Sequence, residues 1–204
     1  QAEAEDLDVV FDLIVNKEQR VPDISYFLPH PDPASNSSVL LSHGQEFHTG
    51  FWGHLGLLGL NDHILLPGFA AYAHTAAASL YPTNAAVADL AHEQSALVGY
   101  VHPIDHVPPD PLRDTDLTSE LPVDVALGKV DYYEVLGFTN NRLATAGLWH
   151  RMLNCGFRLP AGAGTDAMAD FASLRGPVGM NRVYVRSGAP LEYRRWLDSL
   201  KAGR

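Results

Sequence analysis

The chain is organised as short apolar runs that alternate with amphipathic, helix-like segments. Strand-like runs cover 7–15, a stretch ending near 46, then 53–60, 97–102, 131–138, a run ending at 166, and 181–185. Helical patterns cover 82–96 and 141–156, and a last one starts at about residue 190. Strands that alternate with helices are typical of parallel βαβ units, so the pattern predicts an α/β sheet or barrel.

Local signals support these boundaries. Thr83 or Asn84 is suited to cap the first long helix, and Gly156 lies where a glycine commonly follows a helix end. In that first helix, Ala86, Val87, Leu90 and Ala91 are expected to share the buried face. The segments 28–37 and 106–122 are rich in Pro and Asp and are predicted to be loops.

Composition limits the kinds of partner. With 204 residues, of which 46% are hydrophobic and 19% charged, the chain is expected to fold as one soluble domain, 1–204. Fourteen Lys and Arg against 24 Asp and Glu give a net charge of −10, which argues against nucleic acid or an anionic membrane as partner. We expect a small-molecule substrate. A single cysteine, Cys155, excludes an intrachain disulfide and leaves both compartment and oligomeric state open.

Polar residues close several of the predicted strands. Glu46, His102 and Asp166 each follow an apolar run, and Gly162 and Gly164 allow the strand before Asp166 to approach its neighbours closely. In parallel α/β folds the C-terminal ends of strands meet at one edge, where active residues gather. A buried polar group there needs a partner, so we expect these side chains to converge in one cleft.

These residue types suit a divalent metal. Glu46, His102 and Asp166, with His54 leading into the next apolar run, offer the oxygen and nitrogen ligands that Zn, Mn or Fe accept. Taken singly, a strand-end Asp is more often a turn or cap residue and a lone His more often bonds a carbonyl; their shared position favours a metal site. His43, His48 and His106 are expected mainly at the surface, with a role beside the ligands as the alternative.

The ordered motifs "GQEF…GHLGLLGL", "LVGYVHP", "YYEVLGF" and "LNCGFRLPAGAGTDAM" resemble the PHP (polymerase and histidinol phosphatase) superfamily. The similarity covers nearly all of the chain and points to the branch named after the carbaryl hydrolases CehA and McbA. The resemblance implies a distorted (β/α)7 barrel with metal at its C-terminal rim. By motif, Glu46 matches a metal-bridging glutamate, His54 the "GH" histidine, His102 the "HP" histidine and Asp166 the closing aspartate.

Three departures from the family pattern shape the expectation. The family's His-x-His motif is not found and would precede Gln1, so we expect a barrel incomplete at both ends, with a β-rich region following. Asn16–Lys17 stand where an Asp-His pair is usual, and Met168 stands where the closing histidine is usual. We therefore expect one divalent ion (Zn, Mn or Fe), bound weakly by residues 1–204 because two ligands lie upstream. Met168 is expected to be apolar filler rather than the lining of a substrate pocket.

The resemblance implies a metal-dependent hydrolase that cleaves an ester, carbamate or phosphoester with a metal-activated water. His48 or Asp105 is the candidate for accepting the proton of that water. The alternative is a degenerate, non-catalytic binding module that keeps the PHP-like barrel without a complete set of ligands.

Overall fold

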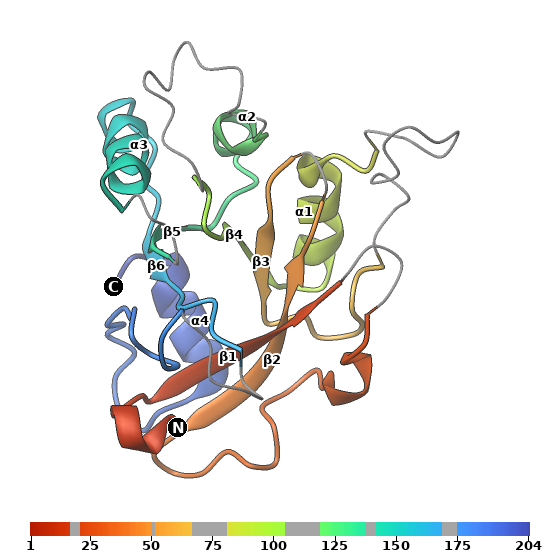
Figure 1. The fold of residues 1–204 in the computed structure, drawn as a ribbon, viewed down its shortest axis with the longest axis vertical. Helices are drawn as coiled ribbons and strands as arrows, with labels where there is room; N and C mark the ends of the chain where they lie inside the picture. The colour runs from red at the N-terminus through yellow and green to blue at the C-terminus, as the bar shows by residue number, and fades with distance from the viewer. Residues whose placement is uncertain (17–20, 50–51, 67–80, 105–118, 138–141, 169–174) are drawn as a thin grey trace.

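The computed structural model describes residues 1–16, 21–49, 52–66, 81–104, 119–137, 142–168 and 175–204. Within these ranges six strands form one sheet in chain order, curled into an open half-barrel (Figure 1). The strands are β1 (Val9–Val15), β2 (Leu40–Phe47), β3 (Leu55–Leu58), β4 (Leu97–Tyr100), β5 (Tyr132–Leu136) and β6 (Ala161–Ala163). The predicted α/β class is confirmed at this level.

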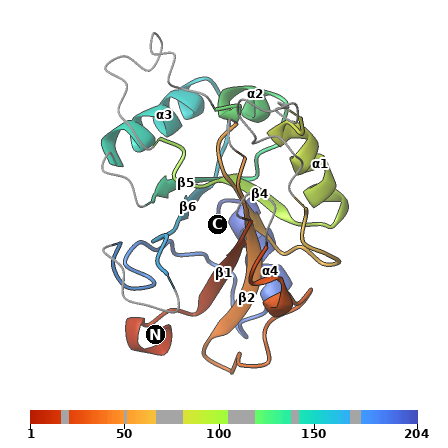
Figure 2. The same ribbon diagram turned by 45° about the vertical axis from the view of Figure 1, so that its right-hand side comes forward.

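Four α-helices accompany the described part of the sheet. They are α1 (Asn84–Glu93), α2 (Leu121–Ala126), α3 (Arg142–Asn154) and α4 (Tyr193–Lys201), with short 3-10 turns at Glu3–Glu5 and Ile24–Tyr26. Figure 2 shows α1, α2 and α3 in an arc at the end of the molecule opposite the N-terminus, while α4 lies nearer to β1 and β2. None of the helices in the described ranges is long and apolar enough to cross a membrane.

Strand β3 runs opposite to both of its neighbours. The β1–β2, β4–β5 and β5–β6 pairs are parallel, whereas β3 is antiparallel to β2 and to β4. The expectation of parallel strands is therefore wrong for β3. The physical reason is the link 48–54 between β2 and β3, because a parallel pair needs a crossover of about a dozen residues or more.

The helix ends follow the local signals in the sequence. The Thr83 side chain accepts a hydrogen bond from the Ala86 N–H, which caps the start of α1. Beyond α3, Gly156 adopts a positive φ of 92°, and the Phe157 N–H bonds back to the Met152 carbonyl. Both predicted caps are confirmed, since these contacts satisfy backbone groups that a helix end leaves unpaired.

Several predicted elements differ from the structure. Residues 181–185 form no strand; instead the Arg182 guanidinium bonds the carbonyls of Glu5 and Gly179, so side-chain contacts fix this segment. Helix α2 begins at the end of the predicted loop 106–122. On α1, Leu90 is exposed, and the buried face contains Asn84, Val87, Ala88 and Ala91.

The outer face of the curled sheet packs against the arc of helices. Its buried cluster joins side chains of β2 to β5 with residues of α1, α2 and α3; members include Phe47, Leu57, Val98, Tyr133, Val87, Leu121 and Met152. Burial of this kind removes apolar surface from water and is the main favourable contribution to folding. The buried cluster therefore holds β2 to β5 in place, and the polar residues at the ends of these strands are described below.

The inner face of the sheet is covered at one end by α4. Leu197 and Leu200 of this helix are buried against Leu58, Leu97 and Tyr132 of the sheet. The partly buried α4 side chains of Tyr193 and Trp196 lie against Phe11 of β1, with ring centroids 6.0 and 5.7 Å from it. The spacing 193, 196, 197, 200 is the helical period of one apolar face.

Tyr132 fills the middle of the inner face because three neighbouring strands carry glycine there. A Cβ placed on Gly56, Gly99 or Gly162 would lie 2.4, 2.2 or 2.7 Å from an atom of the Tyr132 side chain. The Tyr132 hydroxyl also donates to the Gly56 carbonyl over 3.1 Å. These contacts confirm the expectation of tight packing around Gly162 and pull β3, β4 and β6 around one ring.

Replacing Gly99 with alanine should destabilise the fold. The added methyl group would meet a buried ring that has no room to move, and overpacking of this kind costs about 1–3 kcal/mol of unfolding free energy. As the matched control, Gly147 of α3 has no atom within 4 Å of its added Cβ, so Gly147→Ala should stabilise the protein by about 0.5–1 kcal/mol. Chemical denaturation measures both; equal effects would contradict the packing described for Tyr132.

The Asp131 carboxylate connects α1, β4 and α4. It accepts hydrogen bonds from the His92 ring at 2.8 Å, the Val98 N–H at 2.9 Å and the Lys201 ammonium at 2.9 Å. Burial alone would raise the pKa of Asp131, but these partners outweigh burial and hold that pKa below its usual value. The deprotonated carboxylate is thus the form that the folded chain prefers.

Stability should therefore depend on pH through Asp131. Because its folded-state pKa is depressed, the contribution is complete above the unfolded pKa of about 3.9 and disappears as the pH falls through the folded value. Urea unfolding of wild type and Asp131→Asn at a series of pH values should show the largest difference at pH 6 and a shrinking one on acidification. A difference that stays constant with pH would contradict this assignment.

Candidate metal centre

Three of the predicted ligands meet at one edge of the sheet. Glu46 lies near the C-terminal end of β2, His102 follows β4, and His54 precedes β3. Since β2 and β4 point the same way and β3 points back, the end of β2, the end of β4 and the beginning of β3 all lie at this edge. In an all-parallel sheet His54 would lie at the opposite edge, so the reversal of β3 is what brings it here.

The three side chains approach each other closely. The Glu46 Oε1 atom lies 2.9 Å from His102 Nε2 and 3.2 Å from His54 Nδ1, and the two ring nitrogens are 3.3 Å apart. The His54 and His102 rings meet edge to face, with centroids 4.9 Å apart. In the described part of the chain, these three residues form the group of acidic and histidine side chains that could hold a metal ion.

The spacing of these atoms fits a divalent ion. Zinc bonds of about 2.0–2.2 Å to nitrogen and oxygen place neighbouring ligand atoms roughly 3–3.5 Å apart in tetrahedral or octahedral geometry. The observed separations of 2.9, 3.2 and 3.3 Å agree with that range. One carboxylate and two imidazoles are also a donor set that zinc, manganese and iron accept.

His48 is a third imidazole at the same carboxylate. Its Nε2 atom lies 2.9 Å from Glu46 Oε1, and its ring stacks on His54 with centroids 3.8 Å apart and 15° between the planes. The side chain of His48 is 33% exposed, compared with 12% for His102. His48 therefore lies on the more open side of Glu46, in contact with the group that could hold the ion.

Glu46 is held in its charged form. Burial would raise the pKa of this carboxyl, yet hydrogen bonds from His102, His48 and His54 together outweigh burial and keep that pKa far below its usual range. A buried carboxylate is a strong site for a cation, because Coulomb attraction increases where water is excluded.

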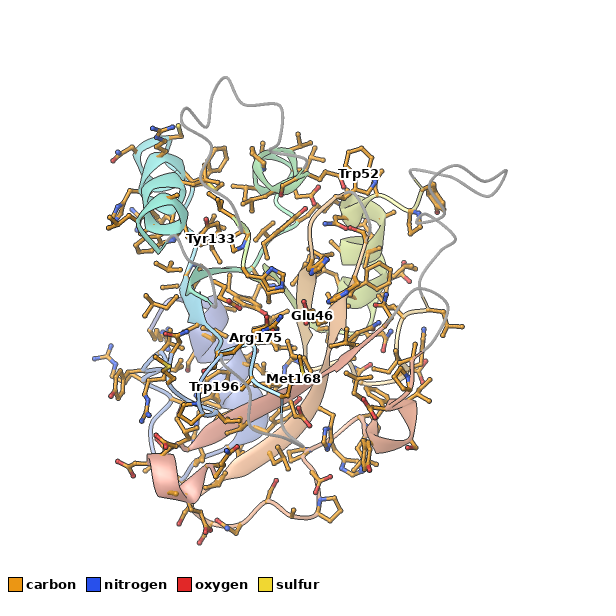
Figure 3. All side chains as sticks on the ribbon, viewed as in Figure 1. Glu46, Trp52, Tyr133, Met168, Arg175 and Trp196 are labelled. Carbon is orange, nitrogen blue, oxygen red and sulfur yellow. The ribbon has the colours of Figure 1, made fainter. Side chains whose placement is uncertain are left out.

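Asp166 lies nearby but is bound to another residue. Arg175 forms an ion pair with the Asp166 carboxylate, and its Nη1 also donates to the Asp166 carbonyl at 3.1 Å. Burial raises the pKa of Asp166, as does the negative charge of Glu46, while Arg175 opposes both. The Asp166 carboxyl is thus close enough to Glu46 for its pKa to respond to that charge. Figure 3 labels Arg175 and Glu46 among the side chains of the molecule. Asp166 does not belong to the three-residue group.

The loop that carries His48 and His54 is tied down by side chains. Thr49 accepts the Trp52 N–H at 3.1 Å and donates to the Gly53 carbonyl at 2.8 Å. The buried Asn84 amide at the start of α1 donates to the carbonyls of Trp52 and Gly53. Because these bonds fix the backbone just before His54, they set the direction in which its ring enters the site.

Glu134 is a buried carboxyl of the site that the sequence analysis missed. The Glu134 Oε1 atom accepts a hydrogen bond from the His102 N–H at 3.2 Å. Glycines make room for this carboxyl: a Cβ added to Gly137 or Gly164 would lie 2.2 or 2.8 Å from a Glu134 oxygen. Burial raises the pKa of Glu134 to about 7, against the lowering effect of His102. The sequence does contain a sign of this residue: in "YYEVLGF" the alternation of a strand puts the charged Glu134 on the same side of β5 as the buried Tyr132.

Other predicted residues have separate outcomes. Asp105 and His106 lie outside the described residues. The surface assignment of His43 is wrong, since its ring is buried and its Nε2 lies 3.1 Å from Asp32. Asn16, interpreted as a lost ligand, bonds the backbone of His48 instead. Met168 is 37% exposed and takes no part in the group that could hold a metal.

Comparison with known proteins adds no relative: no family model matches the chain, and a search of curated proteins finds no match. The resemblance of the motifs to the PHP superfamily therefore stays a hypothesis. The function is argued below from the geometry around Glu46.

Loss of Arg175 should strengthen metal binding. Arg175 places a positive charge near the site and engages the Asp166 carboxylate, so Arg175→Gln frees a carboxylate for the cation. We expect titration calorimetry with Zn²⁺ to show an affinity gain of roughly tenfold, the factor that about 1.4 kcal/mol produces. The gain should disappear in the Asp166→Asn background.

Arg182 supplies the matched control for this experiment. It is also half-buried and bonds a carboxylate, that of Glu5, on the N-terminal segment. Arg182→Gln should leave the affinity for Zn²⁺ unchanged. An equal gain in both variants would mean that only overall charge matters, and the assigned role of the Arg175–Asp166 pair would be wrong.

Proposed function

We propose that this protein is a metal-dependent hydrolase in which Glu46, His54 and His102 hold one divalent ion. The observation that carries the proposal is the convergence of two imidazole nitrogens on one buried carboxylate oxygen, with separations of 2.9 and 3.2 Å. Three mutually close donor atoms in the described chain have no better common partner than a cation. The ion is Zn²⁺, Mn²⁺ or Fe²⁺, all of which accept this donor set.

A bound divalent ion would supply a water molecule activated near neutral pH and polarise a substrate oxygen. The chain's own residues then have distinct tasks. His48, at the more exposed side of Glu46, accepts a proton from the attacking water and returns it to the leaving group. Glu46 stays ionised and supports the charge on His48 over 2.9 Å.

The substrate class follows from the charges around the site. Asp166 and Glu134 add carboxyl groups near Glu46, while the described cation beside them, Arg175, pairs with Asp166. A neutral or singly charged ester or carbamate therefore suits the site better than a highly charged phosphate, with a phosphoester as the third class. On the motif order, we further propose a relationship to PHP-type (β/α)7 barrels and their CehA/McbA-like branch.

A non-catalytic binding module is the second candidate. It is favoured by two specific observations: Asp166 is engaged by Arg175, and Asn16 uses its side chain to bond the backbone of His48. Both residues occupy positions where the resembling family has ligands. On this alternative the chain binds metal or a small molecule and turns over no substrate.

Hydrolysis of 4-nitrophenyl acetate and of bis(4-nitrophenyl) phosphate by protein loaded with Zn²⁺ or Mn²⁺ distinguishes the candidates. We expect metal-dependent ester cleavage that chelation removes, and a loss of about 100-fold or more in Glu46→Gln, because the variant loses the charged ligand. His63→Gln is the control, since His63 lies in an exposed pair with Asp62. Metal binding without turnover would support the binding module; turnover unaffected by Glu46→Gln would overturn the site.

A further inference from the structure

We infer that Asn16 is a positioning residue, whose side-chain amide fixes the backbone of His48 and so directs the His48 ring toward Glu46. The contact between Asn16 and His48 is observed directly, whereas a role of this contact in proton transfer rests on the proposed function. Asn16 follows β1, and nothing in its position at a strand end marks it as a clamp in the sequence.

The contact between these residues has two parts. The Asn16 Nδ2 donates to the His48 carbonyl at 3.0 Å, and the His48 N–H donates to Asn16 Oδ1 at 3.0 Å. The regular pairing of β1 with β2 ends at Val15 and Glu46. The amide of Asn16 therefore offers the same donor and acceptor as a peptide group and continues the pairing by one residue, beyond the end of the strand.

Burial makes this contact selective for asparagine. Asn16 is 1% exposed, so each of its polar atoms must find a partner inside the protein. Asp would keep the acceptor, lose the donor and add a negative charge to an edge that already holds Glu46. Only a neutral amide of this length satisfies both backbone groups of His48 at once.

The clamp acts on the backbone that carries the His48 ring. Its ring has two described contacts, the carboxylate of Glu46 and the face of His54, and one third of its side chain is exposed. The backbone that carries the ring lies past the end of β2, where ladder bonds no longer constrain it. Fixing that backbone helps to keep the His48 Nε2 atom 2.9 Å from Glu46.

Chemical labelling of histidine measures the positioning without a substrate. Brief treatment with diethyl pyrocarbonate, followed by peptide mass spectrometry, gives the labelling rate of each histidine in one sample. The exposed His63 serves as the internal reference. We expect the ratio of His48 to His63 labelling to rise about fivefold in Asn16→Ala, the factor of one net hydrogen bond, and by less in Asn16→Asp, which keeps the acceptor.

His102 should keep its wild-type rate in both variants, whereas His54, on which the His48 ring stacks, is not used as a reference. Asn36→Ala is the matched control, since Asn36 also bonds backbone N–H groups through its side chain, but in the loop before β2. An unchanged His48 rate in Asn16→Ala would overturn the inference. A uniform rise at all histidines would also overturn it, because that outcome means general loosening of the fold.

Kinetics then test the purpose of the clamp. With 4-nitrophenyl acetate and Zn²⁺-loaded protein, Asn16→Ala should lower kcat roughly tenfold or more with little change in KM, as expected for a misplaced proton acceptor. Faster labelling with unchanged kcat would overturn the role in proton transfer. Absence of Zn²⁺ binding in wild type would reject the proposed function, while the labelling would still decide whether Asn16 positions His48.

Discussion

The carboxylate of Glu46 is the constraint around which this edge of the sheet is organised. A buried charge is costly unless it is paired and hydrogen-bonded, and here the partners described are three imidazoles rather than a Lys or Arg. An imidazole nitrogen can hydrogen-bond a carboxylate or, without its proton, coordinate a metal, so the same arrangement pairs the carboxylate and offers a donor set for an ion. This dual fit is the basis of the proposed function.

The fold supplies the convergence through backbone direction rather than through long side chains. The reversed β3 returns His54 to the edge where β2 and β4 end, and Tyr132, packed against glycines of β3, β4 and β6, sets how closely these strands approach. At the other end, α4 closes the inner face with apolar side chains. The candidate ligands therefore lie at one edge of the sheet, and the apolar side chains of α4 pack against the other end of its inner face.

Sequence patterns predicted part of this arrangement. The apolar runs located the six strands to within a few residues. The rule that strand ends share an edge grouped Glu46 with His102, because both lie at the ends of strands of the same direction. His54 lies at the same edge because β3 is antiparallel to β2 and β4, a reversal that the sequence pattern did not predict. The prediction of a strand at 181–185 was wrong: side-chain hydrogen bonds of Arg182 hold this segment, and it has no backbone pairing to the described strands of the sheet.

The remaining differences come from pairing that a single sequence does not encode. Asp166 was expected to close its strand, but β6 ends at Ala163, and Arg175, nine residues later, holds Asp166 in an ion pair. Asn16 was interpreted as a lost ligand, but its side chain bonds the backbone of His48. Glu134 was missed because its surroundings, with room made by Gly137 and Gly164, are known only from the fold. Strand positions could be inferred from the apolar runs; the direction of β3 and the specific side-chain partners required the folded chain.

The most direct test of the metal centre is an anomalous-difference map from crystals of the protein soaked in Zn²⁺, recorded above and below the zinc absorption edge. The proposal predicts a peak bonded to Glu46 Oε1, His54 Nδ1 and His102 Nε2. A map with no peak at these atoms, or with zinc bound only at exposed residues such as His63, would contradict it.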